Sequence, residues 1–148
     1  MNIPRLKNNK NIDSNEKIKF YFDGKKYFGY RGDTLASALL ANNIKLFGRS
    51  FKYHRPRGLL SAGSEEPNGI VQLEKGNLTE PNRRITEVLI YEGLTATSQN
   101  RWPNIKFDFG AINDFLAPFF PAGFYYKTFM WPPTFWKKYE YFIRHAAG

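Results

Sequence analysis

The strongest constraint on the fold of this chain is a pair of short apolar segments joined by an Asp-Gly turn. Residues 18–22 (IKFYF) and 26–30 (KYFGY) are rich in aromatic side chains, and Asp23-Gly24 stands between them. Asp-Gly is a preferred sequence for the tight turn between two antiparallel strands. The pattern therefore predicts a β-hairpin at the start of the folded region.

A short helix is predicted directly after the hairpin. Residues 32–43 read GDTLASALLANN, in which apolar residues recur at helical spacing. Asp33 or Thr34 can accept hydrogen bonds from the first N–H groups of the helix, and Asn42-Asn43 is predicted to end it. This helix is expected to pack across the hairpin.

The order of the predicted elements indicates an α+β fold. After the helix and a long loop, further strands are predicted at residues 70–73 and 87–91. A hairpin, a helix and then later strands is the order of a ferredoxin-type β-grasp domain, with a mixed sheet and one main helix on one face.

The sequence contains no cysteine. A plant-type [2Fe–2S] cluster needs four thiolates, three of them close together in one loop. This chain cannot supply them, so no Fe–S cluster, disulfide or thiolate metal site is expected, and no other metal site is predicted. Where the cluster loop is expected, residues 48–58 read GRSFKYHRPRG, which offers positive charge and hydrogen-bond donors instead.

The chain is basic, and its positive charge is concentrated. It has 22 Lys and Arg residues against 13 Asp and Glu residues, a net charge of +9, and residues 34–64 include no acid. Basic residues interleaved with aromatic ones could belong to a nucleic-acid-binding module, whose affinity for single-stranded DNA would fall steeply with salt. A solvated basic loop is the simpler alternative. We expect no nucleic-acid partner, and no apolar run is long enough to predict a membrane span.

The composition divides the chain into three parts. Residues 1–16 are polar and are predicted to be a mobile tail, and residues 17–97 to be the β-grasp domain. Residues 98–148 are rich in proline and aromatic side chains, with 16 of the 26 aromatic residues of the chain between positions 102 and 142. Short helices are predicted around 112–115 and 135–146. So many rings exceed what a small domain buries, so this part is predicted to be a docking extension; wrapping back over the sheet is the alternative.

Five strings carry a resemblance to a known family. They are GDTLASALLA (32–41), GRSFKYHRPRG (48–58), EEPN (65–68), SQNRWP (98–103) and AGFYYKTFMWP (122–132). In this order they resemble the N-terminal region of the α subunit of heterotetrameric sarcosine oxidase. Similar domains in amine and opine dehydrogenases and in hydrogen cyanide synthase retain their cysteines, so the missing thiols favour the sarcosine oxidase branch.

The resemblance implies a place in a cytoplasmic flavoenzyme complex of α, β, γ and δ subunits. Members of that family demethylate sarcosine oxidatively to glycine, using FAD, FMN, NAD and tetrahydrofolate, with hydrogen peroxide and methylene-tetrahydrofolate as products. Their partners would be the rest of the α subunit and the β subunit, with γ and δ. A domain of a related amine or opine dehydrogenase subunit is the alternative.

The chain departs from the family in what it lacks. It contains no Gly-x-Gly-x-x-Gly, so it cannot hold NAD by that motif and is not expected to catalyse or bind a cofactor alone. We expect either a fragment of a longer α subunit or a separate chain that must assemble with others.

The basic loop, residues 48–58, is the candidate cofactor-facing or interface site. Its candidate residues are Arg49, Lys52, His54, Arg55 and Arg57. Guanidinium groups suit a phosphate or a carboxylate, whether from a flavin, a nucleotide or a neighbouring subunit. The alternative is that the arginines form ion pairs within the chain, with Glu65 and Glu66. Cations around His54 favour its neutral form, and neither metal binding nor general-base catalysis is expected of it.

Two further groups combine hydrogen-bond donors with flat rings and are predicted to contact a partner subunit. They are Gln99, Asn100, Arg101 and Trp102, and Tyr125, Tyr126, Lys127 and Thr128. No catalytic residue is predicted.

Overall fold

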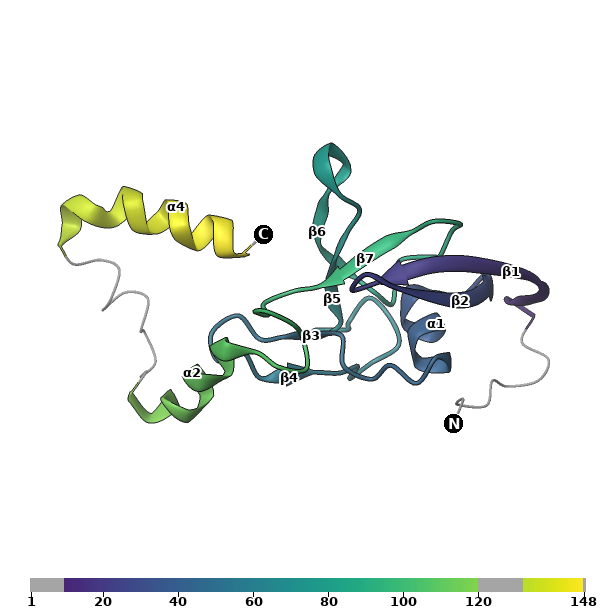
Figure 1. Ribbon diagram of the computed structural model, residues 1–148, viewed down its shortest axis with the longest axis horizontal. Coiled ribbons are helices and arrows are strands. Elements are labelled where there is room, and N and C mark those ends of the chain that lie inside the picture. Colours follow the sequence, from purple (N-terminus) through teal and green to yellow (C-terminus); the bar gives the residue numbers. More distant parts are fainter. Residues whose placement is uncertain (1–9, 120–131, 148) are drawn as a thin grey trace.

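The computed structural model describes residues 10–119 and 132–147. Its main feature is a mixed five-stranded sheet in the order β2-β1-β7-β5-β6 (Figure 1). The strands are β1 (Asp13–Phe22), β2 (Lys25–Arg31), β5 (Ile70–Leu73), β6 (Glu80–Arg84) and β7 (Thr95–Ser98). β1 and β7 run parallel, and the other neighbouring pairs are antiparallel. The sheet, with its single covering helix, confirms the α+β, β-grasp prediction.

The predicted hairpin is present and explains the Asp-Gly sequence. Phe22 pairs with Lys25 across the turn, and the register continues to Ile18 opposite Gly29. Asp23 and Gly24 both have positive φ, 48° and 76°, as the two central residues of a tight hairpin turn require. β1 begins at Asp13, so residues 13–16 are part of a strand in a range predicted to be tail.

Helix α1 (Leu35–Ala41) covers one face of the sheet and is capped as the sequence predicted. The Thr34 Oγ1 atom accepts a hydrogen bond from the Ser37 N–H at 3.2 Å, and Asp33 accepts one from the Ser37 hydroxyl at 2.7 Å. Leu35 and Leu39 are fully buried. They pack in one core, whose other fully buried large side chains are Phe20, Phe47, Val71, Ile85 and Leu94.

The prediction of a strand at residues 87–91 is wrong. This segment makes one isolated bridge, between Thr34 and Leu89, and β7 is the strand that lies beside β1 on the side away from β2. Its alternation of buried and exposed residues is real, because Val88 and Ile90 are buried. Its backbone hydrogen-bonds to the first turn of α1 instead: the Val88 carbonyl accepts a hydrogen bond from the Leu35 N–H at 2.7 Å. The first N–H groups of a helix have no acceptor within the helix, so the carbonyls of an extended segment can accept hydrogen bonds there instead of from a neighbouring strand.

The remaining elements are short, apart from the last helix. A two-stranded ribbon is formed by β3 (Gly48–Arg49) and β4 (Pro56–Arg57). The one-turn helices are η1 (Gly76–Leu78), η2 (Phe109–Ala111), η3 (Ala117–Phe119) and η4 (Pro133–Phe135). The other helices are α2 (Ile112–Phe115) and α4 (Trp136–Ala147), which confirms the helices predicted around 112–115 and 135–146.

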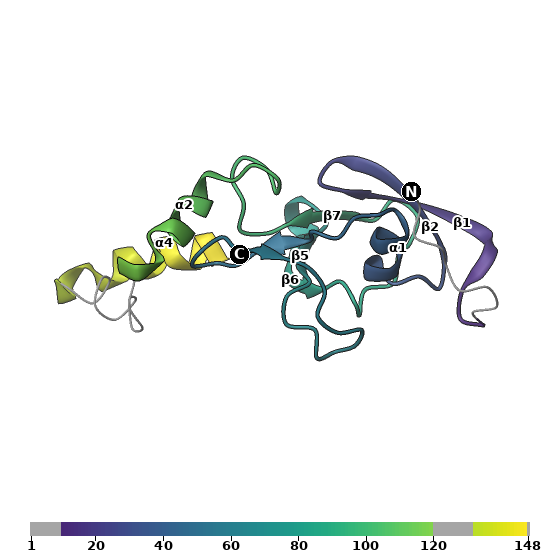
Figure 2. The ribbon, with the colours of Figure 1, turned by 90° about the horizontal axis from the view of Figure 1, so that it is seen from below.

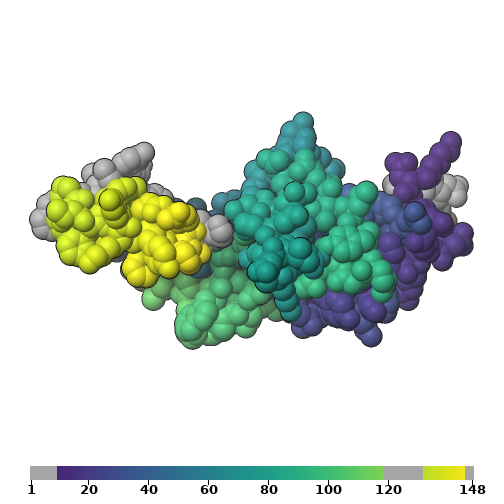
Figure 3. All heavy atoms as spheres, turned by 90° about the horizontal axis from the view of Figure 1, so that it is seen from above, coloured from purple at the N-terminus to yellow at the C-terminus, as the bar shows by residue number. Residues whose placement is uncertain are grey.

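The arrangement is elongated. Figure 2 shows α2 and α4 at the end of the molecule away from the hairpin, and the space-filling view in Figure 3 shows the same outline. Among the described residues, no helix has the length and apolar character needed to cross a membrane.

Candidate functional site

The basic loop is closed into a ribbon by its own backbone. Gly48 pairs with Arg57 and Arg49 with Pro56. Inside this ladder the Ser50 N–H donates to the Arg55 carbonyl at 2.9 Å. His54 turns the chain with a positive φ of 52°. The loop therefore has one defined shape, and its side chains have defined directions.

Arg49 points into the protein and is satisfied there. Its side chain is only 8% exposed. The guanidinium donates to the Ile105 carbonyl at 2.9 Å and to the His54 carbonyl at 2.7 Å, and its Nε lies 3.4 Å from the Asp108 carboxylate. Arg49 is one of the cations predicted to bind an anion, and its guanidinium has its partners within the chain.

Asp108 is the centre of this cluster. Its side chain is fully buried, and its Oδ2 lies 2.7 Å from His54 Nδ1. Its Oδ1 accepts hydrogen bonds from the Trp102 N–H at 2.8 Å and the Gly110 N–H at 3.1 Å. Burial alone would raise the pKa of Asp108, but these hydrogen bonds outweigh it and hold the pKa below its usual value. An ionised Asp108 thus joins the basic loop to the segment after β7.

The other cations of the basic loop are more exposed. Arg55 Nε donates to Asp114 Oδ1 at 2.6 Å, with both side chains about half exposed. Arg55 and Lys52 each lie 4.8 Å from the centre of the Tyr53 ring, within the range of cation–π attraction.

The intrachain ion pairs of the basic loop differ from those named in the sequence-based alternative. Arg49 and Arg55 pair with Asp108 and Asp114. That alternative named Glu65 and Glu66 instead, but the Glu66 carboxylate is bound by backbone N–H groups.

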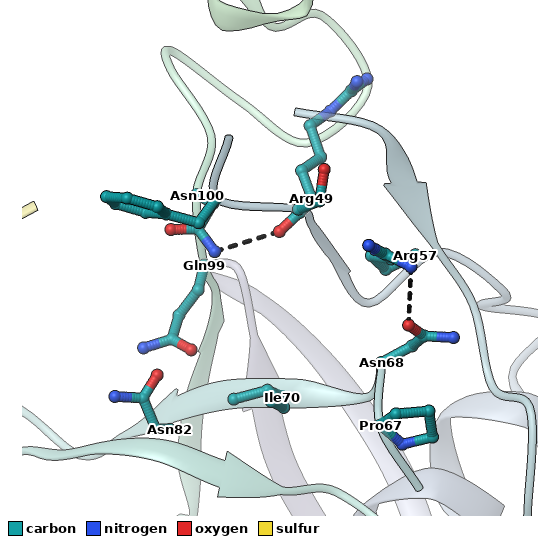
Figure 4. A pocket seen from close by; sticks show the side chains of 10 residues that line it. Arg49, Arg57, Pro67, Asn68, Ile70, Asn82, Gln99 and Asn100 are labelled. Atoms are coloured by element: carbon teal, nitrogen blue, oxygen red, sulfur yellow. Dashed lines mark hydrogen bonds between the residues drawn. The ribbon is translucent and has the colours of Figure 1, made fainter. Parts of the chain in front are cut away.

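A cavity of about 370 Å³ lies beside the basic loop, between the β3–β4 ribbon and the end of β7 (Figure 4). Carboxamides are prominent in its lining: Asn68, Asn82, Gln99 and Asn100. Arg57 donates to Asn68 Oδ1 at 2.8 Å, and Asn100 Nδ2 donates to the Arg49 carbonyl at 3.0 Å. Figure 4 shows the Arg49 side chain directed away from these carboxamides.

The predicted partner-contacting residues after β7 have mixed environments. Arg101 is tied to the hairpin turn, because its Nη2 donates to Asp23 Oδ1 at 2.9 Å and its Nε donates to the Ser98 hydroxyl. Gln99 accepts the Arg49 N–H through its carbonyl at 3.2 Å. Trp102 is 67% exposed. Tyr125, Tyr126, Lys127 and Thr128 lie outside the described residues.

Sequence reasoning missed Asp108 and Asp114, the acidic residues that bind the basic loop. Asp108 is 54 positions from His54, so no local pattern joins them. A signal did exist: between residues 93 and 139 these two are the only acids, in a segment rich in aromatic rings. Isolated acids in such a segment are candidates for ion pairs with a basic loop elsewhere in the chain.

A family model described as a 2Fe-2S iron-sulfur cluster binding domain matches residues 15–101. The residues present do not fit that cluster, because the sequence has no cysteine to supply thiolates. In the described part of the chain, no three His, Cys, Asp or Glu side chains are grouped so that they could hold a metal ion.

Curated relatives are sarcosine oxidase α subunits. Over 138 residues, 93% of this chain, it is 59% identical to sarcosine oxidase subunit alpha of Rhizobium meliloti (strain 1021). It is 38% and 42% identical, over 58% of its length, to the subunits named alike from Corynebacterium sp. strains U-96 and P-1. The chain spans only 14% of the first relative and 9% of the other two.

A solved structure of L-proline dehydrogenase from P. horikoshii aligns with 60% of this chain and 16% of that chain, at 25% identity and a TM-score of 0.45. The sequence resemblance to sarcosine oxidase α subunits is confirmed by the curated relatives. The chain belongs to the family of 2Fe-2S iron-sulfur cluster binding domains, as a cysteine-free member similar to sarcosine oxidase α subunits.

Proposed function

We propose that this chain is the N-terminal assembly domain of a sarcosine oxidase α subunit. The observation that carries the proposal is the 59% identity with the Rhizobium meliloti α subunit, which extends over 93% of this chain. The β-grasp domain then serves as a scaffold, because it has no thiolate for the redox cofactor of its family. The chain itself is not catalytic and binds no cofactor alone.

The proposed complex oxidises the methyl group of sarcosine. Sarcosine, oxygen and tetrahydrofolate are converted to glycine, hydrogen peroxide and methylene-tetrahydrofolate. FAD, FMN, NAD and the folate are held by the rest of the α subunit and by β, with γ and δ completing a cytoplasmic heterotetramer. This chain contributes contacts to that assembly.

The proposed contact surface is an aromatic face after β7. It consists of Trp102, Phe107, Phe109, Ile112 and Phe115. All five side chains are more than half exposed, and the rings of Trp102 and Phe107 lie 5.1 and 5.0 Å from that of Phe109. Large apolar side chains that gather on a surface are typical of a protein contact site. We therefore place the docking extension, residues 98–148, at the boundary with the rest of the complex.

The basic loop is joined to the aromatic face through Asp108. Asp108 lies between Phe107 and Phe109 in sequence, and its carboxylate is held by His54 and lies in ion-pair range of Arg49. The aromatic face is thereby fixed relative to the β-grasp domain. Lys52 lies over the Tyr53 ring and Arg55 is about half exposed, and we infer that these two cations meet acidic groups of a neighbouring subunit.

An exchange of segments tests the proposal. The part of the Rhizobium meliloti α subunit that matches this chain is replaced by the chain, and the hybrid is expressed with the other subunits of that enzyme. We expect a flavin-containing complex of normal size that oxidises sarcosine. A hybrid α subunit that folds but does not enter the complex would contradict the assembly role. A second hybrid with Arg55→Glu tests the outer side of the loop, where unchanged assembly and flavin content would exclude an anion contact.

A further inference from the structure

A second acidic site lies in the loop that joins β4 to β5 (Figure 1), and it is organised around Glu66. Glu66 is fully buried. Its Oε2 accepts hydrogen bonds from the Leu60 and Ser61 N–H groups at 2.7 and 2.6 Å. Its Oε1 accepts them from the Asn68 and Gly69 N–H groups at 2.7 and 3.0 Å. Four backbone donors from both ends of one loop therefore converge on one carboxylate.

This carboxylate is neutralised by backbone dipoles. Among the residues that the structure describes, no Lys, Arg or His side chain forms an ion pair with it. The Arg84 guanidinium donates to the Glu66 backbone carbonyl at 3.2 Å rather than to its carboxylate. Burial alone would raise the pKa of Glu66, but the four N–H donors outweigh it and lower the pKa. The site thus favours a negative charge.

The loop is shaped for this arrangement. Gly63 accepts hydrogen bonds through its carbonyl from the Glu66 N–H at 3.2 Å and the Thr86 hydroxyl at 2.8 Å. A Cβ on Gly69 would lie 2.9 Å from the side chains of Ile85 and Leu59, so any other residue at this position would force those core-facing side chains to shift. Packing on the core holds the donors in place.

Converging backbone N–H groups form anion-binding nests, which elsewhere hold phosphate groups and iron–sulfur clusters. We propose that residues 60–69 are such an anion-binding nest and that the chain closes it with its own Glu66 carboxylate. Removal of the side chain exposes a site for one small carboxylate, such as formate or acetate. The inference rests on Glu66 and its donors and is independent of the proposed sarcosine oxidase role.

Chemical rescue of the 148-residue chain tests this inference. Glu66→Ala removes the acceptor of four backbone N–H donors and is expected to unfold at a lower urea concentration than the wild-type chain. Formate or acetate is expected to restore part of the loss in a saturable manner, while chloride at equal ionic strength does not. The wild-type chain and Glu65→Gln, a change at the exposed neighbouring acid, should show no such response to formate. A folded Glu66→Ala variant that formate does not stabilise would overturn the proposal.

A second variant covers the case in which Glu66→Ala does not fold. Glu66→Gln keeps the shape of the side chain but directs an amide NH₂ group at two backbone donors. It is expected to be less stable than the wild-type chain above pH 4.5, the ordinary carboxyl pKa, and to lose part of the acid dependence of stability. Equal stability of Glu66→Gln and the wild-type chain at neutral pH would show that the nest needs no anion.

Discussion

At the scale of single residues, the buried acids organise this protein more than its many cations do. Asp108 holds the basic loop against the segment after β7, and Glu66 holds together the loop before β5. Each is buried and each accepts hydrogen bonds from backbone N–H groups. Positive charge is abundant along the chain, so the positions of the few buried carboxylates decide which segments are held together.

Asp108→Asn is expected to destabilise the chain. The change leaves the buried Arg49 guanidinium with carbonyl partners only, at an expected cost of about 2–3 kcal/mol in the free energy of unfolding. Urea unfolding monitored by tryptophan fluorescence measures it. Asp114→Asn is the matched control, because its pair with Arg55 is half exposed and should contribute less than about 1 kcal/mol. Equal effects of the two variants would refute the central role of Asp108.

Acid should weaken the fold through the same two residues. The pKa values of Glu66 and Asp108 are lowered in the folded state from ordinary values of 4.5 and 3.8. Their contribution to stability is therefore complete above pH 4.5 and is lost as pH falls through the lowered values. Urea midpoints measured down the acid range should decline below pH 4.5. A decline that is just as steep in the Glu66→Gln and Asp108→Asn variants would point to other groups.

At the scale of elements, the contact between the basic loop and η2 depends on a glycine. A Cβ on Gly110 would lie 2.2 Å from His54 Nδ1 and 2.3 Å from its Cε1. The imidazole ring therefore packs on bare backbone while it bonds to Asp108. This contact joins two elements that are far apart in sequence.

Gly110→Ala should force the His54 ring away from Asp108. We expect a loss of about 1–3 kcal/mol in the free energy of unfolding, as for other overpacked sites. NMR of the His54 imidazole measures whether the hydrogen bond is lost. Gly63→Ala is the control, since a Cβ there meets no atom within 4 Å and should change stability by no more than about 0.5 kcal/mol. An unshifted His54 signal in Gly110→Ala would disprove the predicted displacement.

At the scale of the whole molecule, the β-grasp core and the aromatic face have separate roles. The core side chains lie between the sheet and α1, while the aromatic face is made by η2, α2 and the residues before them. A change in the aromatic face can therefore affect assembly without affecting folding.

Phe115→Asp is expected to leave the fold intact and to weaken entry into the complex by tenfold or more, since burying an unpaired charge in an interface typically costs more than about 1.4 kcal/mol. Phe115 is 84% exposed in the chain. Size-exclusion analysis of the hybrid α subunit with its partner subunits measures the effect. Leu78→Asp is the control, because Leu78 is 75% exposed and lies on η1, outside the aromatic face. If both variants assemble like the unmodified hybrid, the aromatic face is not the docking site.

The local parts of this fold could be read from the sequence because their signals are local. The Asp-Gly turn, the Thr34 cap and the helical spacing after it each act within a few residues, and each is present in the structure. The strand at residues 87–91 was mispredicted, because its alternation of buried residues does not say whether the backbone bonds to a sheet or to a helix end. The absence of cysteine can also be read directly from the sequence, and by itself it ruled out the iron–sulfur cluster of the family.

The ion pairs and the nest depended on tertiary structure. Sequence reasoning placed anion binding in the basic loop and, as the alternative, named Glu65 and Glu66 as partners for its arginines. The fold instead brings Asp108 to Arg49 and His54, and it directs four backbone N–H groups at Glu66. Residue types alone determined a basic, cysteine-free β-grasp domain. Which charges meet was decided only when distant segments packed together, because a buried charge pairs with whatever donor the fold places within about 3 Å, regardless of its distance along the chain.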